Sequence, residues 1–179
     1  MSAIAAVVVV VAAILAYAAT RPDTFRIERS TTIQAPPEKV FALIEDLRAW
    51  SAWSPWDKLD PAMKRTFSGA ARGRGAAHAW EGNGKAGAGR MEITESLPPS
   101  KIVLKLDFIK PFEGHNVVEF DLAAKDGGTQ ATWAMSGPTS FVWKVMHLFV
   151  DMDKMIGRNF EDGLAAMKTA AEKGSSTAR

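Results

Sequence analysis

The stretch Thr129–Met167, TQATWAMSGPTSFVWKVMHLFVDMDKMIGRNFEDGLAAM, contains the change of period that decides the fold. Up to Ser136 apolar and polar residues alternate, with Trp133 and Met135 on one face, which is typical of a strand. From Ser140 onward the apolar residues instead recur every three or four positions: Val145, Phe149, Met152, Ile156, Phe160, Leu164 and Met167. This spacing predicts one long amphipathic helix of about seven turns.

Upstream of this stretch the chain contains a run of short alternating segments. The strand patterns cover residues 63–67, 76–81, 89–97, 101–108, 116–124 and 129–136. Between them, Asn83-Gly84 and Asp126-Gly127 are sequences typical of hairpin turns. A run of strands followed by a helix predicts an α+β fold with an antiparallel sheet. A sheet of this length must curve, and the C-terminal helix can lie in the curve.

The sequence that precedes these strands, residues 25–61, predicts one more strand followed by two short helices. Phe25, Ile27 and Ile33 mark the strand, and Pro36-Pro37 opens a helix. The apolar stripe of that helix consists of Val40, Phe41, Ile44 and Leu47. Residues 50–61 predict a second short helix and a loop, with tryptophans at three-residue spacing: Trp50, Trp53 and Trp56. These tryptophans cap the core, flank a pocket entrance or contact a membrane surface.

The first twenty residues, MSAIAAVVVVVAAILAYAAT, contain no charged side chain. A helix over residues 3–19 would be roughly 25 Å long, close to a hydrocarbon core of about 30 Å once flanking residues reach the interface. Residues 1–21 are therefore predicted to form a transmembrane signal anchor. The alternatives are a secretory signal cleaved near Ala16-Tyr17-Ala18, or a buried or disordered tail.

Arginines and lysines follow this segment and none precede it, so the positive-inside rule places the domain on the cytoplasmic side of a single-pass membrane protein. Cleavage would make the domain periplasmic or secreted. Residues 22–174 have the size of one domain, and residues 175–179 are predicted to be a disordered tail.

The composition excludes several classes of function. A net charge of +2, mixed in sign, offers no basic stripe for nucleic acid. Cysteine is absent, which excludes disulfides, thiolate nucleophiles and cysteine metal sites. The histidines lack metal-ligand spacing, so neither a metal nor a cofactor is expected. The G-x-G-x-x-G sequence at residues 82–87 lies between two strands, which argues for a hairpin and against a dinucleotide site.

A curved sheet that grips a helix usually leaves a space between the two, and the apolar faces predict its lining. The ligand-binding candidates are Trp80, Leu104, Leu106, Phe108, Phe120, Trp133, Met135, Phe149 and Met152. Periodicity alone leaves open whether these residues line a cavity or fill a core. His78, which alternates with Trp80 on one strand, and Glu81 are the candidate catalytic acid–base groups.

Several motifs carry a family resemblance: APPEKVFALIED at residues 35–46, then Trp50, WSPW at 53–56, FIKPF at 108–112 and TWAM at 132–135. Together they resemble the SRPBCC superfamily, the START-like and polyketide cyclase/dehydrase-like group, and the last two resemble a bacterial branch of it. The resemblance covers about residues 25–171. It implies a helix-grip fold, with a curved antiparallel sheet, two short helices after the first strand and a long C-terminal helix, here preceded by one transmembrane helix.

Members of this superfamily bind lipids, sterols, polyketides or plant hormones, and some are cyclases or chaperone activators. The sequence therefore predicts membrane-tethered binding of a hydrophobic small molecule or lipid between the sheet and the C-terminal helix. Two alternatives stay open: a polyketide cyclase- or dehydratase-like enzyme using His78 or Glu81, and a protein-interaction module resembling the chaperone activators. The apolar N-terminal segment departs from the soluble cyclases and weighs against a biosynthetic role.

Overall fold

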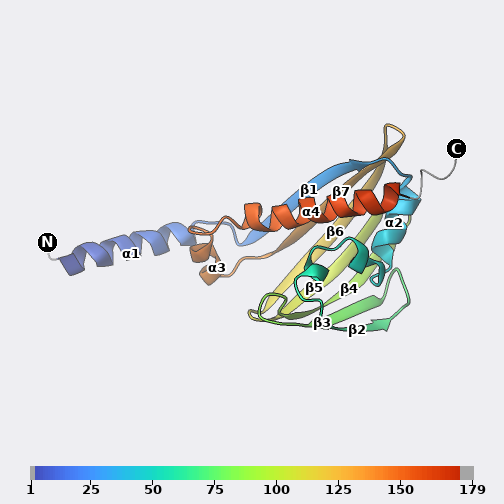
Figure 1. Ribbon diagram of the computed structural model, residues 1–179. Helices are drawn as coiled ribbons and strands as arrows, with labels where there is room; N and C mark the ends of the chain where they lie inside the picture. Colours follow the sequence, from blue (N-terminus) through green and yellow to red (C-terminus); the bar gives the residue numbers. More distant parts are fainter. Residues whose placement is uncertain (1–2, 174–179) are drawn as a thin grey trace.

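The computed structural model, which describes residues 3–173, shows a seven-stranded antiparallel sheet curved around a long helix (Figure 1). The strands are β1 (Thr24–Ile33), β2 (Lys64–Gly69), β3 (Ala76–Glu81), β4 (Ala88–Leu97), β5 (Lys101–Lys110), β6 (Gly114–Lys125) and β7 (Gly128–Pro138). Their spatial order is β1-β7-β6-β5-β4-β3-β2, so β1 and β2 form the two edges and β1 pairs with the last strand. The predicted α+β helix-grip fold is confirmed.

The helices lie on one side of this sheet. Helix α2 (Pro37–Glu45) and two 3-10 helices, η1 (Ala49–Ala52) and η2 (Trp56–Lys58), connect β1 to β2. Helix α4 (Met152–Glu172) lies across the sheet (Figure 1) and buries Phe160, Leu164 and Met167, whose spacing places them on one face. Its approach is close at Gly163, where a Cβ atom would lie 2.7 Å from Cζ3 of Trp133.

The C-terminal helix is interrupted, so the prediction of one continuous helix of seven turns is wrong. Five residues, 147–151, separate helix α3 (Phe141–Met146) from α4, which begins at Met152. Ser140 caps α3, and the carboxylate of Asp151 accepts a hydrogen bond of 2.9 Å from the backbone N–H of Lys154 at the start of α4. Because Asp151 satisfies an amide that a helix start leaves unpaired, it begins a new helix despite the continuous apolar period.

Helix α1 (Ala3–Ala19) projects from one end of the domain and contacts α3 (Figure 1). Its valines are exposed, from 48% at Val11 to 62% at Val7. With seventeen residues it is about 25 Å long. Among the helices of residues 3–173, none combines the length and apolar character needed to cross a bilayer, so the predicted transmembrane anchor is not supported. The predicted tail at 175–179 lies outside the described residues.

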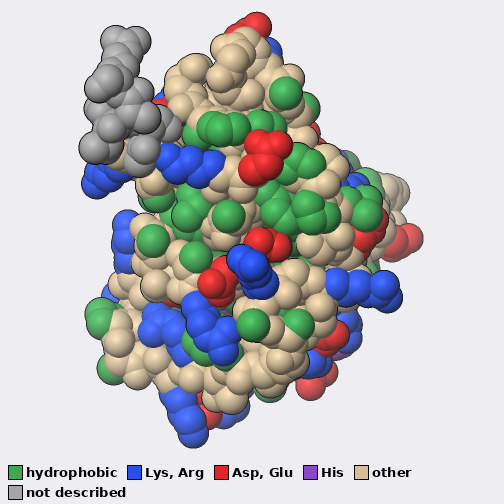
Figure 2. Space-filling view, turned by 90° about the vertical axis from the view of Figure 1, so that its right-hand side faces the viewer, with side chains coloured by type: hydrophobic (Ala, Val, Ile, Leu, Met, Phe, Trp, Pro, Cys, Tyr) green, Lys and Arg blue, Asp and Glu red, His purple; other side chains and the backbone are tan. Residues whose placement is uncertain are grey.

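Charged residues are spread over the domain surface. Figure 2 shows the end opposite α1, where cationic and anionic side chains are interspersed and neither sign dominates. Opposite charges also join α4 to β1, because Arg29 forms ion pairs of 2.8 Å with Asp153 and 2.9 Å with Glu161. The hydrogen bond from Arg29 lowers the pKa of Asp153, so this link stays ionised in mildly acidic solution.

Candidate functional site

The sheet and α4 enclose a cavity of about 850 Å³. Strands β1 and β3 to β7, η1, η2, α3 and the first half of α4 contribute to its walls. The lining is mostly apolar and includes Trp80, Met91, Leu104, Leu106, Phe108, Val118, Trp133, Met135, Met152 and Phe160. Clefts of this size and composition are typical of sites for small apolar ligands.

Strand pairing arranges the sheet part of the lining in rows. His78, Met91 and Leu106 lie opposite one another on β3, β4 and β5. A second row runs through Leu104 and Val118 on β5 and β6 and continues to Met135 on β7. Since successive residues of a strand point to opposite faces, both rows face the side on which α4 lies.

Trp80 forms the part of the wall nearest the turn between β3 and β4. Its indole Nε1 donates a hydrogen bond of 3.0 Å to the carbonyl of Ala86, and its ring meets Phe108 edge-on at 6.0 Å between centroids. The ring lies over Gly89, where a Cβ atom would be 2.5 Å from Cη2 of the indole. The absence of a side chain at Gly89 therefore gives Trp80 its position.

The turn at residues 82–87 joins β3 to β4, which confirms the hairpin prediction for the G-x-G-x-x-G sequence. Gly87 has φ +62°, and a Cβ atom there would collide with the backbone carbonyl of Lys110. Glycine is thus required at this position for conformation and for the close approach of β5. A phosphate-binding helix N-terminus does not follow this turn, since a strand follows it.

His78 is the titratable group that lies deepest in the lining, with 6% of its surface exposed. Its ring stacks on Phe67 at 4.8 Å between centroids, and Nε2 has no hydrogen-bond partner within residues 3–173. Burial lowers the pKa of His78, and nearby Asp57 opposes this effect only in part. At neutral pH the imidazole is therefore uncharged and presents one N–H donor and one acceptor nitrogen.

Three lining residues have buried polar atoms without a hydrogen-bond partner in the described part of the chain. These atoms are Nε2 of His78, Nε1 of Trp133 and Oγ1 of Thr139. A buried polar atom left unpaired costs about 1–3 kcal/mol. A ligand that offers hydrogen-bonding groups to these atoms would recover part of that free energy, so they are candidate orienting groups in an apolar site.

An aromatic cluster fills the space between the sheet and the helices beside the cavity. It consists of Trp50, Trp53, Phe120, Trp133 and Phe160. Trp133 stacks on Phe160 at 4.4 Å with an interplanar angle of 8°. The indole N–H groups of Trp50 and Trp53 donate to backbone carbonyls of α2, each at 2.9 Å. Trp50 and Trp53 are therefore buried in the core, one of the predicted alternatives, although Trp50 also borders the cavity, and Trp56 is half-buried and lines it.

Seven of the nine predicted ligand-binding residues line the cavity: Trp80, Leu104, Leu106, Phe108, Trp133, Met135 and Met152. Phe120 does not, because it packs inside the aromatic cluster with 1% exposure. Phe149, in the link between α3 and α4, is 73% exposed. The predicted contacts with a ligand remain predictions for all nine residues.

The two candidate acid–base residues are not brought together. His78 lines the cavity, whereas Glu81 is exposed at the end of β3 and lies 3.5 Å from Nζ of Lys110. Sequence analysis missed Met91, whose alternation with Ile93 on β4 was available as a signal, and Thr139, which follows β7 and has no periodic signal. Within residues 3–173, no group of three or more acidic or histidine side chains could hold a metal ion.

The curved sheet, the gripped helix and the cavity between them define a helix-grip protein. The chain matches the family described as "Polyketide cyclase / dehydrase and lipid transport" over residues 24–172, and it belongs to that family. This confirms the predicted SRPBCC relationship for the domain. A comparison with curated proteins gives no match.

Solved structures with a similar fold share little sequence with this chain. Protein CV1439 from Chromobacterium violaceum is 17% identical, with a TM-score of 0.58 over 85% of this chain and 99% of that one. The Aha1 dimer from Colwellia psychrerythraea is 16% identical, with a TM-score of 0.58 over 83% of this chain and 96% of that one. The di-domain ARO/CYC protein BexL, from the BE-7585A biosynthetic pathway, is 16% identical, with a TM-score of 0.60 over 88% of this chain and 53% of BexL.

Proposed function

We propose that the protein binds a hydrophobic small molecule or lipid in the cavity between the sheet and α4. The observation that carries the proposal is an apolar cavity of about 850 Å³ whose lining includes three unpaired polar atoms. Apolar area removed from water stabilises a complex by about 25 cal/mol per Å². The polar atoms of His78, Trp133 and Thr139 then fix the orientation of the bound molecule. The description of the family, which includes lipid transport, supports this function.

The test uses dodecanol as an uncharged apolar probe and compares two neighbouring residues of β5. Phe108 lines the cavity, whereas Ile109 points to the opposite face and is 55% exposed. Phe108→Ala should weaken dodecanol binding roughly ten-fold because it removes buried contact area, and Ile109→Ala should leave it unchanged. No binding by the intact protein, or equal effects of the two substitutions, would contradict cavity binding.

A second function, a cyclase- or dehydratase-like reaction, is favoured by the position and charge state of His78. Its uncharged imidazole, with an unpaired Nε2 at the cavity, can accept a proton from an acidic methylene between two ketone carbonyls. The resulting carbanion would form a carbon–carbon bond with another carbonyl carbon of the same chain, and the proton would return to the new alkoxide. Neither step needs a redox partner or a metal.

The substitution His78→Asn distinguishes a binding function from a catalytic one. A catalytic His78 contributes about 10²–10⁴-fold to the rate and little to affinity. Product formation from a linear poly-β-ketone is therefore compared in the intact protein, His78→Asn and Glu81→Gln. Conversion that depends on His78 would establish the enzyme, and binding without conversion would support the binding function. If Glu81→Gln loses conversion and His78→Asn keeps it, the reaction does not take place in the cavity.

We also propose that residues 1–21 contact a membrane. Helix α1 has no charged residue, and the side chains of Ile4 and Val7 to Val10 are 57–76% exposed. Burying such an apolar surface in lipid is favourable, because it removes the side chains from water. Intact protein should sediment with phosphatidylcholine vesicles, and Val8→Lys with Val11→Lys should abolish this. The matched double substitution Ala123→Lys with Ala124→Lys, on exposed β6 positions, should leave sedimentation with the vesicles unchanged. Equal sedimentation of the two double variants would contradict the membrane contact.

A further inference from the structure

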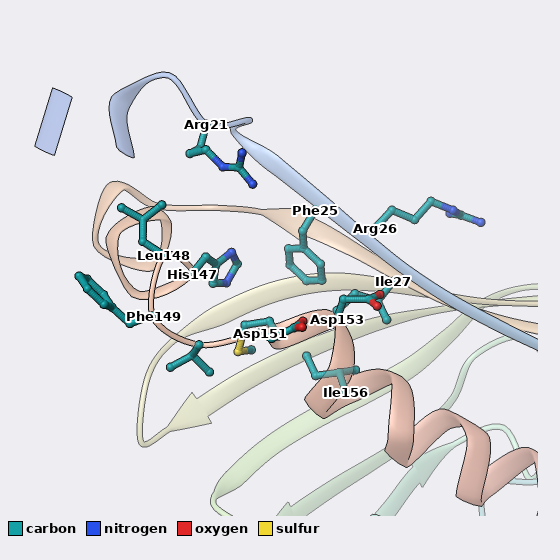
Figure 3. A pocket seen from close by; sticks show the side chains of 12 residues that line it. Arg21, Phe25, Arg26, Ile27, His147, Leu148, Phe149, Asp151, Asp153 and Ile156 are labelled. Atoms are coloured by element: carbon teal, nitrogen blue, oxygen red, sulfur yellow. The ribbon is translucent and has the colours of Figure 1, made fainter. Parts of the chain in front are cut away.

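A second hollow of about 570 Å³ lies beside the cavity and is called the outer pocket here (Figure 3). It is formed by the chain just after α1, by β1, by the link between α3 and α4, and by the start of α4. Four residues line both hollows: Phe25, His147, Met152 and Ile156. The outer pocket and the cavity therefore share a wall made of these side chains.

Four charged side chains line the outer pocket, and three of them already have partners. Arg26 forms an ion pair of 2.5 Å with a carboxylate of β6, and Asp153 forms one of 2.8 Å with an arginine of β1. Asp151 caps α4 through a hydrogen bond of 2.9 Å. Arg21 forms no ion pair with any residue from 3 to 173, and its guanidinium lies 5.9 Å from the centroid of the Tyr17 ring. Asp151 has no ion-pair partner in residues 3–173 either, but its carboxylate is held at the helix start by that backbone N–H, which leaves Arg21 as the cation of the outer pocket without an acidic partner.

His147 adds a hydrogen-bond donor beside this charge. Its ring has no hydrogen bond to another described residue and contacts Trp143 at 6.3 Å between centroids. A neutral imidazole always carries one N–H, so His147 has a donor in either tautomer. Figure 3 shows Arg21, His147 and Phe25 around the same hollow, with Ile156 at the beginning of α4. Polar donors and the apolar part of the wall shared with the cavity therefore meet in one place.

Resting on the proposed binding function, we infer that the ligand is an amphipathic acid, an apolar chain that ends in a carboxylate. The carboxylate binds Arg21 and the N–H of His147 in the outer pocket. The chain passes between Phe25 and Met152 into the cavity. A guanidinium holds a carboxylate through two parallel charge-assisted hydrogen bonds, which are stronger than bonds between neutral groups. Arg21 is then the residue that distinguishes an acid from an uncharged ligand of equal length.

The experiment compares dodecanoate with dodecanol, which share the same chain and differ in the charged end. The intact protein should bind dodecanoate about ten-fold more tightly and with one molecule per chain, since a hydrogen bond to a charged group contributes more than a neutral one. Arg21→Gln should remove this preference by weakening dodecanoate alone. The matched control is Arg74→Gln, because Arg74 is exposed in the loop between β2 and β3, and it should leave the preference intact.

Each outcome separates the inference from the function on which it rests. Equal binding of acid and alcohol by the intact protein overturns the inference and leaves cavity binding standing. A preference that survives in Arg21→Gln, or is lost equally in Arg74→Gln, also overturns it. Binding of neither probe overturns the proposed function itself. His147→Phe, which keeps a ring and removes the N–H, should reduce the preference in part, and a fully retained preference would remove His147 from the site.

Discussion

The aromatic cluster and the wall of the cavity lie on the same face of the same sheet, yet one is solid and the other is hollow. In the cluster, Trp53 and Phe120 are 0% and 1% exposed, because they pack on each other and on the rings of Trp50 and Trp133. In the wall, Trp80 and Phe108 are half-buried and touch each other across a glycine. The contrast teaches that the residue type does not decide between core and cavity. What decides is how closely a helix can approach, as α4 does at Gly163.

The largest expected effect separates these two regions by stability. Phe120→Ala should lower the free energy of unfolding by about 3–5 kcal/mol, because it leaves a void in a packed core. Phe108→Ala should cost much less, since one side of this ring already faces the cavity. Urea denaturation of both variants checks the difference. Equal losses would mean that the two regions are packed alike.

A smaller effect concerns the dependence of stability on pH. Burial holds the pKa of His78 below its ordinary value of about 6.5, so the unfolded chain binds a proton more readily than the folded protein. His78 therefore leaves the free energy of unfolding undiminished above pH 6.5. This free energy falls as the pH drops from 6.5 through the pKa of His78 in the folded protein. His78→Gln, which cannot titrate, should lose less stability between pH 7 and pH 5 than the intact protein. Parallel curves for the two proteins would contradict a buried neutral His78.

The smallest expected effect is at Phe149, which the periodicity assigned to the helix face against the sheet. Since its side chain is 73% exposed, Phe149→Asp should change the free energy of unfolding by no more than about 0.5 kcal/mol. Leu164→Asp is the matched control on α4, where 2% exposure forces a charge into the core and a loss of several kcal/mol. Thermal unfolding compares the two. A large loss at Phe149 would place the link between α3 and α4 inside the core.

Much of the fold could be predicted because strands and helices have different periods. The pattern of 101–108 locates β5, and the spacing of Phe160, Leu164 and Met167 locates the buried face of α4. The interruption at Asp151 could not be read from periodicity, since the apolar spacing continues across it. Only the capping chemistry of that side chain distinguishes two helices from one.

The site was predicted less completely, for a geometric reason. Alternation reports which face of a strand a side chain occupies, and Phe120 and Leu104 both occupy the inner face. It does not report the distance from that face to the helix above it. Phe120 therefore could not be separated from the residues that line the cavity. The outer pocket joins residues of β1 and α4, which are periodic, to Arg21 and the link between α3 and α4, and no period reports that the fold brings these segments together.

Gly89, which lies under the ring of Trp80, affects how the shape of the cavity can change between related proteins. A Cβ atom at Gly89 would lie 2.5 Å from the indole, so any larger residue there must push Trp80 aside. Gly89 is not itself among the lining residues. A single substitution beneath the wall would therefore change the shape of the cavity while every lining residue keeps its identity. Within a family built on this scaffold, selectivity for ligand size can be inherited at a position that no ligand touches.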